Sequence, residues 1–212
     1  MKVDSLIEKF ADQPVVESAA LITFIGDAAT ARVQISRWVS SGRLIQLRRG
    51  YYLLAPKLRR REPDVHYIAN VLCAPSYVSL TYALGFYGMI PEAVVTVTSV
   101  TTRRPVLYST PIARFEYRHI APHLFWGYET QEPQGVTPVQ IALPEKALLD
   151  LIYLTPGKAD EVFFESLRLQ HLDVIDAPRL HAFAARFGGR KMPSAARAYE
   201  KYASIHQGRP TP

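Results

Sequence analysis

The N-terminal part of the chain carries apolar residues at helical spacing in three short segments. These segments predict helices over residues 3–12, 17–24 and 28–41. Pro14 ends the first helix, and Asp27 is a favourable N-cap for the third. Two short apolar runs follow, separated by a Gly-containing turn, and they predict a β-hairpin with strands over residues 44–47 and 51–54. Three helices followed by a hairpin is the element order of a winged helix-turn-helix.

The third predicted helix has two faces of different character. The face that must pack inward carries Ala28, Ala31, Ile35, Trp38 and Val39. The opposite face carries Thr30, Val33, Gln34, Arg37 and Ser40, with Arg32 and Ser36 on its flanks. Such a helix fits the major groove of B-DNA, where Arg37 suits guanine, Gln34 suits adenine and Val33 suits a thymine methyl group. Thr30, near the helix start, suits a phosphate.

Arginines also mark the predicted hairpin and the segment that follows it. Arg48 and Arg49 precede the glycine of the turn, which places them at the tip of the predicted wing, where they suit a minor groove or a phosphate backbone. A proline-bounded basic segment over residues 57–64 is interpreted as a linker or arm that could clamp further phosphates. The predicted DNA contacts are Thr30, Arg32, Gln34, Arg37, Arg43, Arg48, Arg49, Arg59, Arg60 and Arg61. The alternatives are a merely solvated basic surface or a winged helix that docks another protein.

Beyond the basic segment, helical and β-rich patterns alternate in blocks. Helices are predicted over residues 65–73 and 80–87, and again over 144–154, 159–170, 177–187 and 194–203. Strands are predicted over residues 93–100, 106–108, 112–120, 124–128 and 139–143. Strands grouped between helices favour an α+β domain with a mostly antiparallel sheet and terminal helices. The predicted organisation is a winged helix-turn-helix over 1–56, the linker over 57–64, an α+β domain over 65–205 and a frayed tail over 206–212.

Charge and cysteine content narrow the partners and the compartment. The chain has a net charge of +6, and residues 1–62 hold 11 Lys and Arg against 6 Asp and Glu. An anionic partner is therefore expected to dock at the N-terminal part. The lone Cys73 lies in an apolar run, which predicts a buried, inert thiol and a reducing compartment. No apolar run reaches the roughly 20 residues of a membrane span, so a cytoplasmic location without membrane contact is expected.

Catalytic and metal-binding patterns are missing from the sequence. The glycines lack the spacing of phosphate-binding loops, and Pro122 breaks any helix that would pair His119 with His123 on a metal. Glu145 and Lys146 are adjacent, so they do not form the Glu-x-Lys pattern of a nuclease. Instead, Glu145 suits the first turn of a helix, and Lys146 is spaced to pair with Asp150. The sequence therefore predicts a non-enzymatic protein with no catalytic residues, no metal and no cofactor.

A second group of arginines falls in the β-rich stretch. Arg103 and Arg104 follow one predicted strand, whereas Arg114 and Arg118 share one face of the next. This surface could bind RNA, a nucleotide or an acidic protein. The alternative is that they are ordinary outward arginines on a half-exposed sheet.

The ordered set of motifs resembles the AbiEi-type antitoxins of bacterial abortive-infection and type IV toxin–antitoxin systems. The resemblance covers roughly residues 1–200 and rests on GRLIQLRRGYYLL (42–54), SYVSLTYALGFYGMIPE (76–92), VTVTSVTTRRP (95–105), FEYRHI (115–120) and LPEKALLDLIYL (143–154). It implies a DNA-binding winged helix joined to a C-terminal antitoxin domain. It further implies repression of the protein's own operon through inverted repeats, with cooperative DNA binding and bending. The implied functional partner is a nucleotidyltransferase-like toxin encoded nearby, countered without a stable complex.

Carried onto this chain, the resemblance assigns DNA contact to the third helix and the wing. Antitoxic activity then falls on the C-terminal domain, where Arg103, Arg104, Arg114 and Arg118 are the candidate residues. Two other functions compete with this interpretation. One is a stand-alone transcription factor whose C-terminal domain senses a ligand or binds a protein, and the other is a nucleic-acid enzyme targeted by the winged helix. Recognition of an inverted repeat needs two copies of the chain. Whether these copies associate before they bind DNA is left open by the sequence.

Overall fold

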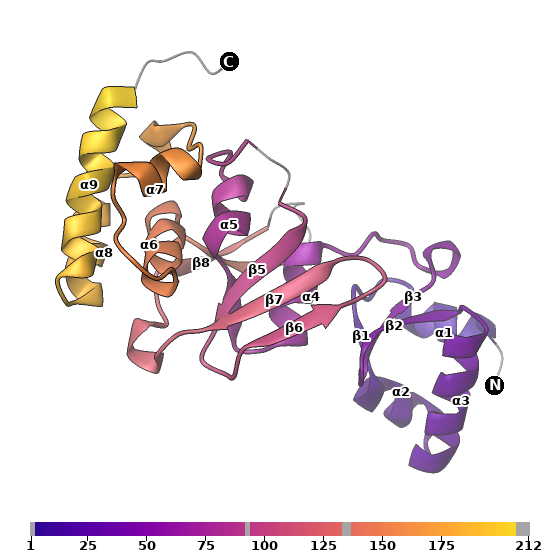
Figure 1. Cartoon of the computed structure of the whole chain (residues 1–212). Coiled ribbons are helices and arrows are strands. Elements are labelled where there is room, and N and C mark those ends of the chain that lie inside the picture. Colours follow the sequence, from indigo (N-terminus) through magenta and orange to yellow (C-terminus); the bar gives the residue numbers. More distant parts are fainter. Residues whose placement is uncertain (1–2, 92–93, 133–136, 207–212) are drawn as a thin grey trace.

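The computed structural model describes residues 3–91, 94–132 and 137–206. Figure 1 shows a smaller N-terminal unit beside a larger α+β unit. The smaller unit contains helices α1 (Val3–Phe10), α2 (Ser18–Ile25) and α3 (Ala28–Ser40), and strands β1 (Val16–Glu17), β2 (Leu44–Arg48) and β3 (Tyr51–Leu54). The three predicted helices and the predicted hairpin are confirmed within one to three residues. The short β1 was not predicted; it pairs with β3 to give a sheet in the order β1-β3-β2.

The N-terminal unit has its own small hydrophobic core. Trp38 of α3 is completely buried among apolar side chains of the other elements, including Leu6, Phe10 and Leu21. The rings of Phe10 and Phe24 meet edge to face at 5.4 Å between centroids. This packing fixes α3 against α1 and α2 and leaves its other side in solvent.

The larger unit is built on a six-stranded mixed sheet. Its strands are β4 (Ser76–Val78), β5 (Thr96–Thr101), β6 (Val106–Ser109), β7 (Arg114–His119), β8 (Tyr128–Gln131) and β9 (Val139–Ala142). Their order is β6-β7-β5-β4-β9-β8. The pairs β5–β7 and β4–β9 are parallel, whereas β6–β7, β4–β5 and β8–β9 are antiparallel. The α+β class is confirmed, and the sheet contains more parallel pairing than expected.

Two strand predictions in this unit were wrong. The three-residue β4 was not predicted, although it lies at the centre of the sheet between β5 and β9. The strand predicted over 124–128 is instead a 3₁₀ turn, η2 (Pro122–Leu124), followed by β8. Apolar residues of this stretch, such as Leu124 and Trp126, are buried through loop packing. Burial alone therefore produced the apolar pattern that resembled a strand. The part of the predicted strand 93–100 that falls on residue 93 lies outside the described residues.

Helices cover both faces of the sheet. The remaining elements are η1 (Pro56–Leu58), α4 (Val65–Leu72), α5 (Leu80–Phe86), α6 (Pro144–Leu154), α7 (Glu161–Ser166), η3 (Leu172–Val174), α8 (Ala177–Phe187) and α9 (Lys191–His206). In Figure 1, α4 lies behind the sheet, and α6 to α9 gather at the opposite end from the N-terminal unit. The predicted helix over 159–170 is shorter in the structure, and the predicted last helix is longer.

The C-terminal end of α9 includes His206, which was expected to belong to a frayed tail. The His206 ring stacks on Tyr202 at 4.2 Å between centroids, and its Nδ1 bonds the Tyr202 carbonyl at 2.9 Å. The rest of the predicted tail, 207–212, lies outside the described residues.

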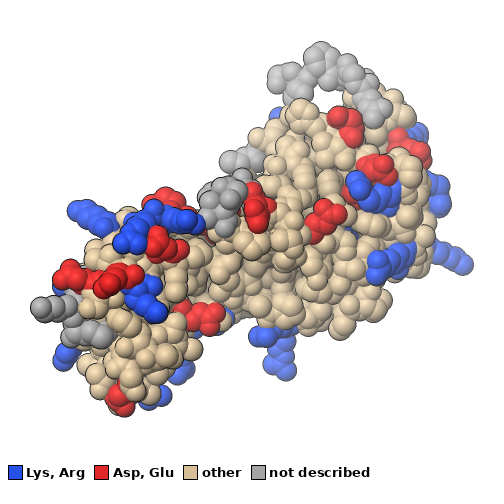
Figure 2. All heavy atoms as spheres, turned by 180° about the vertical axis from the view of Figure 1, so that it is seen from behind, with Lys and Arg blue, Asp and Glu red and all other residues tan. Residues whose placement is uncertain are grey.

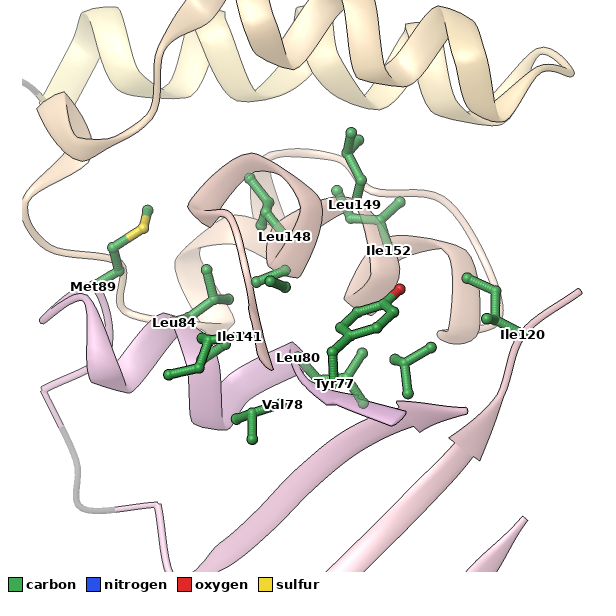
Figure 3. Close-up of a cluster of buried hydrophobic side chains, with 14 of the residues drawn as sticks. Tyr77, Val78, Leu80, Leu84, Met89, Ile120, Ile141, Leu148, Leu149 and Ile152 are labelled. Carbon is green, nitrogen blue, oxygen red and sulfur yellow. The ribbon is translucent and has the colours of Figure 1, made fainter. Parts of the chain in front are cut away.

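The main core lies between the sheet and α5, α6 and α8. Figure 3 shows Tyr77 pointing from β4 toward α6, among Leu148, Leu149 and Ile152. Burying a leucine or isoleucine side chain stabilises the fold by about 1.5–3 kcal/mol each. Cys73 is buried near the same sheet, as predicted.

The two units contact each other directly. Leu47 and Leu53 of the hairpin are buried as part of the larger core rather than the N-terminal one. The segment interpreted as a linker is also fixed, because the Arg60 backbone N–H donates to the Ala11 carbonyl at 2.9 Å and Asp64 caps α4. The segment 57–64 is therefore tied to the N-terminal unit through Arg59 and Arg60, while Lys57, Arg61 and Glu62 stay exposed. Within the described ranges, every helix is too short or too polar to cross a membrane.

Candidate nucleic-acid interface

Helix α3 is held in place at both ends. Asp27 caps its N-terminus by accepting a hydrogen bond from the Thr30 backbone N–H at 2.6 Å. This bond lowers the pKa of the Asp27 carboxyl below its ordinary value, because it favours the charged form. At the other end, the Arg43 backbone N–H donates to the Trp38 carbonyl at 2.8 Å and starts β2. These hydrogen bonds fix the position of α3, and therefore of its exposed side, relative to the hairpin.

The outward face of α3 carries the residues that the helical wheel placed there. Thr30, Val33 and Arg37 are exposed, and Gln34 is half-buried. With Ala29, they line a shallow hollow of about 350 Å³. Val33 has 53% of its surface exposed, which is high for a valine without a covering element. The structure therefore brings Thr30, Gln34 and Arg37 together on one accessible surface, as predicted.

A second, larger hollow lies between α3 and the hairpin. Its volume is about 440 Å³, and Arg32 of α3 and Arg49 of the hairpin both line it. Four polar side chains share its wall: Ser18, Ser36, Ser40 and Gln46. The Ser18 backbone N–H donates to the Gly50 carbonyl at 2.8 Å and ties the start of α2 to the hairpin turn. Ile22, Ile35 and Val39 form the apolar part of the wall. Two arginines beside neutral donors suit an anion with several oxygens.

Ser18 and Gln46 were not among the predicted contacts. Gln46 is exposed on β2, and a register shift between Gln46 and Arg48 interrupts the regular pairing with β3. The alternation of inward and outward side chains along residues 44–48 places Gln46 outward, but it does not indicate that this side chain lines a hollow. Ser18 comes from α2, whose position against the hairpin becomes visible only in three dimensions.

Arg48 departs from the prediction that it lies at an exposed tip. Its guanidinium carbon lies 4.0 Å from the centroid of the Tyr51 ring and 5.4 Å from that of Tyr108 on β6. Its Nε is buried and, among the described residues, has no hydrogen-bond partner. The register shift turns this side chain toward the larger unit, so Arg48 joins the two units through cation–π contacts. Arg49 alone keeps the exposed position next to Gly50.

The arginines outside the hairpin turn are distributed unevenly. Arg43 is exposed but lies at the open end of the hairpin, beside the Leu44–Leu54 pair. Arg59 pairs with Glu62, also donates to the Leu54 carbonyl at 3.4 Å, and keeps only 11% of its side chain exposed.

Arg60 is also paired with an acid. Its Nη1 lies 2.7 Å from Asp12 Oδ2, at the end of α1. Arg59 and Arg60 are thus paired with acids of the protein itself, whereas Arg61 is exposed and unpaired in the described part of this run. Phosphate binding by the three arginines stays a prediction. Figure 2 shows the same mixture, with Asp and Glu interspersed among Lys and Arg over the N-terminal unit on the rear face.

The four arginines of the β-rich stretch do not form one cluster. Arg103 and Arg104 are exposed between β5 and β6, and the Arg103 carbonyl contacts His119 Nδ1 at 3.0 Å at the end of β7. Arg118 is on the same end of the sheet, where it bonds the Leu154 carbonyl at 3.2 Å and pairs with Glu116 at 3.7 Å.

Arg114 lies at the other end of β7, opposite Thr96 and Ser109. It shares a face with Arg118, as predicted, because Phe115 and Tyr117 between them point inward. The two arginines are four steps apart along the strand, which corresponds to roughly 13 Å. The predicted surface is thus divided into an Arg103–Arg104–Arg118 group and a separate Arg114.

The polar residues of α6 are buried and serve the core. Lys146 Nζ pairs with Asp150 Oδ1 and donates to the Tyr77 hydroxyl at 2.7 Å, and Ser79 Oγ donates to Asp150 Oδ2 at 2.8 Å. Burial raises the pKa of the Asp150 carboxyl and lowers that of the Lys146 ammonium, each effect being opposed by the partner charge. The predicted pair is confirmed, and it is completely buried.

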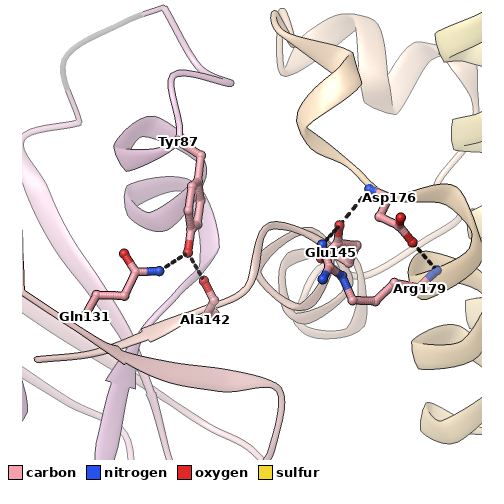
Figure 4. A network of polar contacts seen from close by, with 6 residues as sticks. All are labelled: Tyr87, Gln131, Ala142, Glu145, Asp176 and Arg179. Carbon is pink, nitrogen blue, oxygen red and sulfur yellow. Dashed lines mark hydrogen bonds and ion pairs between the residues drawn. The ribbon is translucent and has the colours of Figure 1, made fainter.

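Glu145 points away from Lys146 toward another helix. Figure 4 shows its carboxylate accepting bonds from the Asp176 backbone N–H at 2.7 Å and from Arg179 Nε at 3.0 Å. Glu145 and Lys146 therefore do not share a site, in agreement with the failed nuclease pattern. No group of three or more His, Cys, Asp or Glu side chains among the described residues is arranged to hold a metal ion.

No family model matches the chain, and no curated protein matches it in sequence. A similar fold occurs in the crystal structure of the RV2827C protein from Mycobacterium tuberculosis. The two chains superpose with a TM-score of 0.54 at 14% sequence identity, over 99% of this chain and 80% of the other. At this identity the likeness concerns the fold, which is shared along nearly the whole of this chain.

Proposed function

We propose that this chain is a DNA-binding transcriptional regulator whose N-terminal unit is a winged helix-turn-helix. In this proposal α3 is the recognition helix and the β2–β3 hairpin is the wing. The proposal is based mainly on the hollow that Arg32 and Arg49 line together. The face of α3 that carries the exposed Arg37 lies beside this hollow. The sequence from Ala28 to Arg61 contains nine Lys and Arg and no Asp or Glu. A stretch of this composition attracts a phosphate backbone, and the acids near it, Asp12, Asp27 and Glu62, come from outside the stretch.

The two hollows suit different parts of a DNA duplex. The outward face with Val33, Gln34 and Arg37 suits the base edges of the major groove, which accommodates one helix. The hollow between α3 and the hairpin suits the adjacent sugar–phosphate strand, with Arg32 and Arg49 as the cations and Ser36 and Gln46 as neutral donors. Arg48, Arg59 and Arg60 are left out of this interface because their charged groups have partners within the protein.

The wider role that we propose is autorepression together with antitoxin activity. The resemblance to AbiEi-type antitoxins supports this role through the order of five motifs along the chain. Two copies of the chain would bind an inverted repeat in its own promoter. This arrangement does not require the two copies to associate in the absence of DNA. The antitoxin activity would oppose a nucleotidyltransferase-like toxin without a stable complex. The Arg103–Arg104–Arg118 group is the surface that we propose for it.

Replacing Arg49 by alanine is expected to flatten the salt dependence of DNA binding. Arg49 is exposed at the hairpin turn and lines the hollow, so its removal should abolish about one phosphate contact. The slope of log affinity against log salt should then decrease in magnitude by roughly 0.9. The measurement is fluorescence anisotropy on a duplex taken from upstream of the gene, at several salt concentrations.

Arg48→Ala is the matched control for this experiment, because it removes the same charge one residue away. Its guanidinium is stacked between Tyr51 and Tyr108, so the salt slope should not change. The free energy of unfolding should instead fall by about 0.5–2 kcal/mol, the usual range for a cation–π contact. An unchanged slope for Arg49→Ala would remove the hairpin from the proposed interface.

A further inference from the structure

A cavity of about 400 Å³ lies between α4 and α5, away from the proposed DNA interface. Its lining is mostly aromatic and aliphatic and includes His66 of α4, Tyr82 and Phe86 of α5, and Ile90. Gly85, Pro91 and Val94 complete the lining, and a Cβ at Gly85 would lie 3.4 Å from Val94 Cγ2. Pockets that bind small molecules typically combine such apolar walls with one or two fixed polar groups.

His66 supplies the polar group, and its orientation is fixed. Asp64 Oδ1 lies 2.6 Å from His66 Nδ1 and also accepts the His66 backbone N–H at 2.8 Å. Asp64 has only 4% of its surface exposed. In the neutral tautomer whose ring proton is on Nδ1, facing Asp64 Oδ1, Nε2 is a hydrogen-bond acceptor. Within the described residues, Nε2 has no hydrogen-bond partner.

The rings around His66 stand at an angle to it. Its centroid is 5.6 Å from that of Tyr82 at 60° and 5.5 Å from that of Phe86 at 74°. The Phe86 contact is T-shaped and the Tyr82 contact is tilted, so neither ring is stacked face to face on His66, and an aromatic lining of this kind suits a flat ring. Phe86 is 36% exposed, although it is one of the largest apolar side chains on this surface.

Negative charge lies directly behind this wall. Asp64 Oδ2 is buried and has no hydrogen-bond partner in the described part of the chain. Burial is the main cause of a raised pKa of the Tyr82 hydroxyl, and the nearby Asp64 charge adds to it. A ligand that donates a proton in a hydrogen bond is therefore favoured in this cavity over one that only accepts.

We propose that the cavity binds a small planar heteroaromatic molecule that carries a ring N–H. The ring stacks against Phe86 and Tyr82, and its N–H donates to His66 Nε2. This cavity shares no lining residue with the two hollows of the proposed DNA interface, so ligand binding and DNA binding can be tested separately. Occupation of the cavity would make the larger unit a ligand-binding domain attached to a DNA-binding one.

Indole and 1-methylindole are the probes that test this proposal, because they differ in the N–H group. Titration of the full-length protein is followed by isothermal calorimetry and by shifts of α4 and α5 amide signals. Indole is expected to bind saturably, and 1-methylindole roughly 3–10-fold more weakly, the usual value of one net hydrogen bond. His66→Phe keeps an aromatic ring but removes the acceptor, so both probes should then bind equally.

His123→Phe is the matched control, since His123 is exposed on η2 and does not line the cavity. It should leave the preference for indole unchanged. If His66→Phe fails to fold, Phe86→Ala replaces it and should weaken both probes. The proposal is overturned if indole does not bind saturably, if 1-methylindole binds as tightly as indole, or if folded variants at the cavity bind like the unmodified protein.

Discussion

Replacing Asp150 by alanine is expected to lower the free energy of unfolding by about 3–5 kcal/mol. Asp150 is completely buried and accepts hydrogen bonds from Lys146, Tyr77 and Ser79. Its removal leaves the Lys146 ammonium without its counter-ion in a site closed to water, which is more costly than the loss of the pair itself. Urea unfolding near neutral pH, followed by tryptophan fluorescence and circular dichroism, measures this loss.

The double variant Lys146→Met with Asp150→Leu is the control for this interpretation. It removes both charges and keeps apolar side chains of similar size, so it should be clearly less destabilising than Asp150→Ala. Ser79 loses its Asp150 partner in both variants, whereas Tyr77 also loses its contact with Lys146 in the double variant. This difference acts against the double variant, so a smaller destabilisation there is the more telling result. If the double variant is as unstable as Asp150→Ala, the unpaired lysine is not the cause.

Replacing Arg37 by alanine is expected to weaken binding to the correct DNA site by about 1–3 kcal/mol and to relax its sequence specificity. Arg37 is exposed on the outward face of α3, in the hollow with Gln34 and Val33. In the proposed docking, this side chain reaches base edges, so the loss should be large for the native site and small for unrelated DNA. Competition titrations with both duplexes measure the two affinities.

Arg60→Ala is the matched control, because it lowers the net charge by the same amount. Arg60 lies outside both hollows and pairs with Asp12. Its replacement should leave the ratio of specific to non-specific affinity unchanged. If both variants weaken the two duplexes to the same extent, Arg37 acts only through general charge and does not contact bases.

Much of the N-terminal unit could be predicted from the sequence, because its signals are local. The cap at Asp27, the inward face with Trp38 and the glycine of the hairpin turn each act over a few residues. The helical wheel placed Ala31, Ile35 and Trp38 on the buried face of α3 correctly, but it was wrong for Ala28, which is exposed in the first turn of the helix. The groups that the structure brings together on α3 were therefore predictable.

The positions of arginines depend on contacts between distant segments, and there the sequence was misleading. A register shift turns Arg48 inward onto Tyr108, which is far away along the chain. Asp12 neutralises Arg60 across a similar gap in sequence. Counting cations in a segment cannot reveal such pairings. The sequence therefore did not predict the inward position of Arg48 or the acidic partners of Arg59 and Arg60.

The order and pairing of the strands in the six-stranded sheet could not be predicted from local sequence patterns either. The central strand β4 has only three residues, all buried, so it shows no alternation. Its parallel pairing with β9 and the parallel pairing of β5 with β7 depend on the path of the chain between strands. The burial of Lys146 and Asp150 follows from that topology, because β4 brings Tyr77 and Ser79 against α6.

The affinity of the purified protein for DNA from directly upstream of its own gene tests the central claim most directly. It is compared with a scrambled duplex of equal length over a series of salt concentrations. The proposed function predicts tight binding that weakens steeply with salt, with at least roughly a tenfold preference for the native duplex. Equally weak binding to both duplexes would contradict the proposal that this chain regulates its own operon.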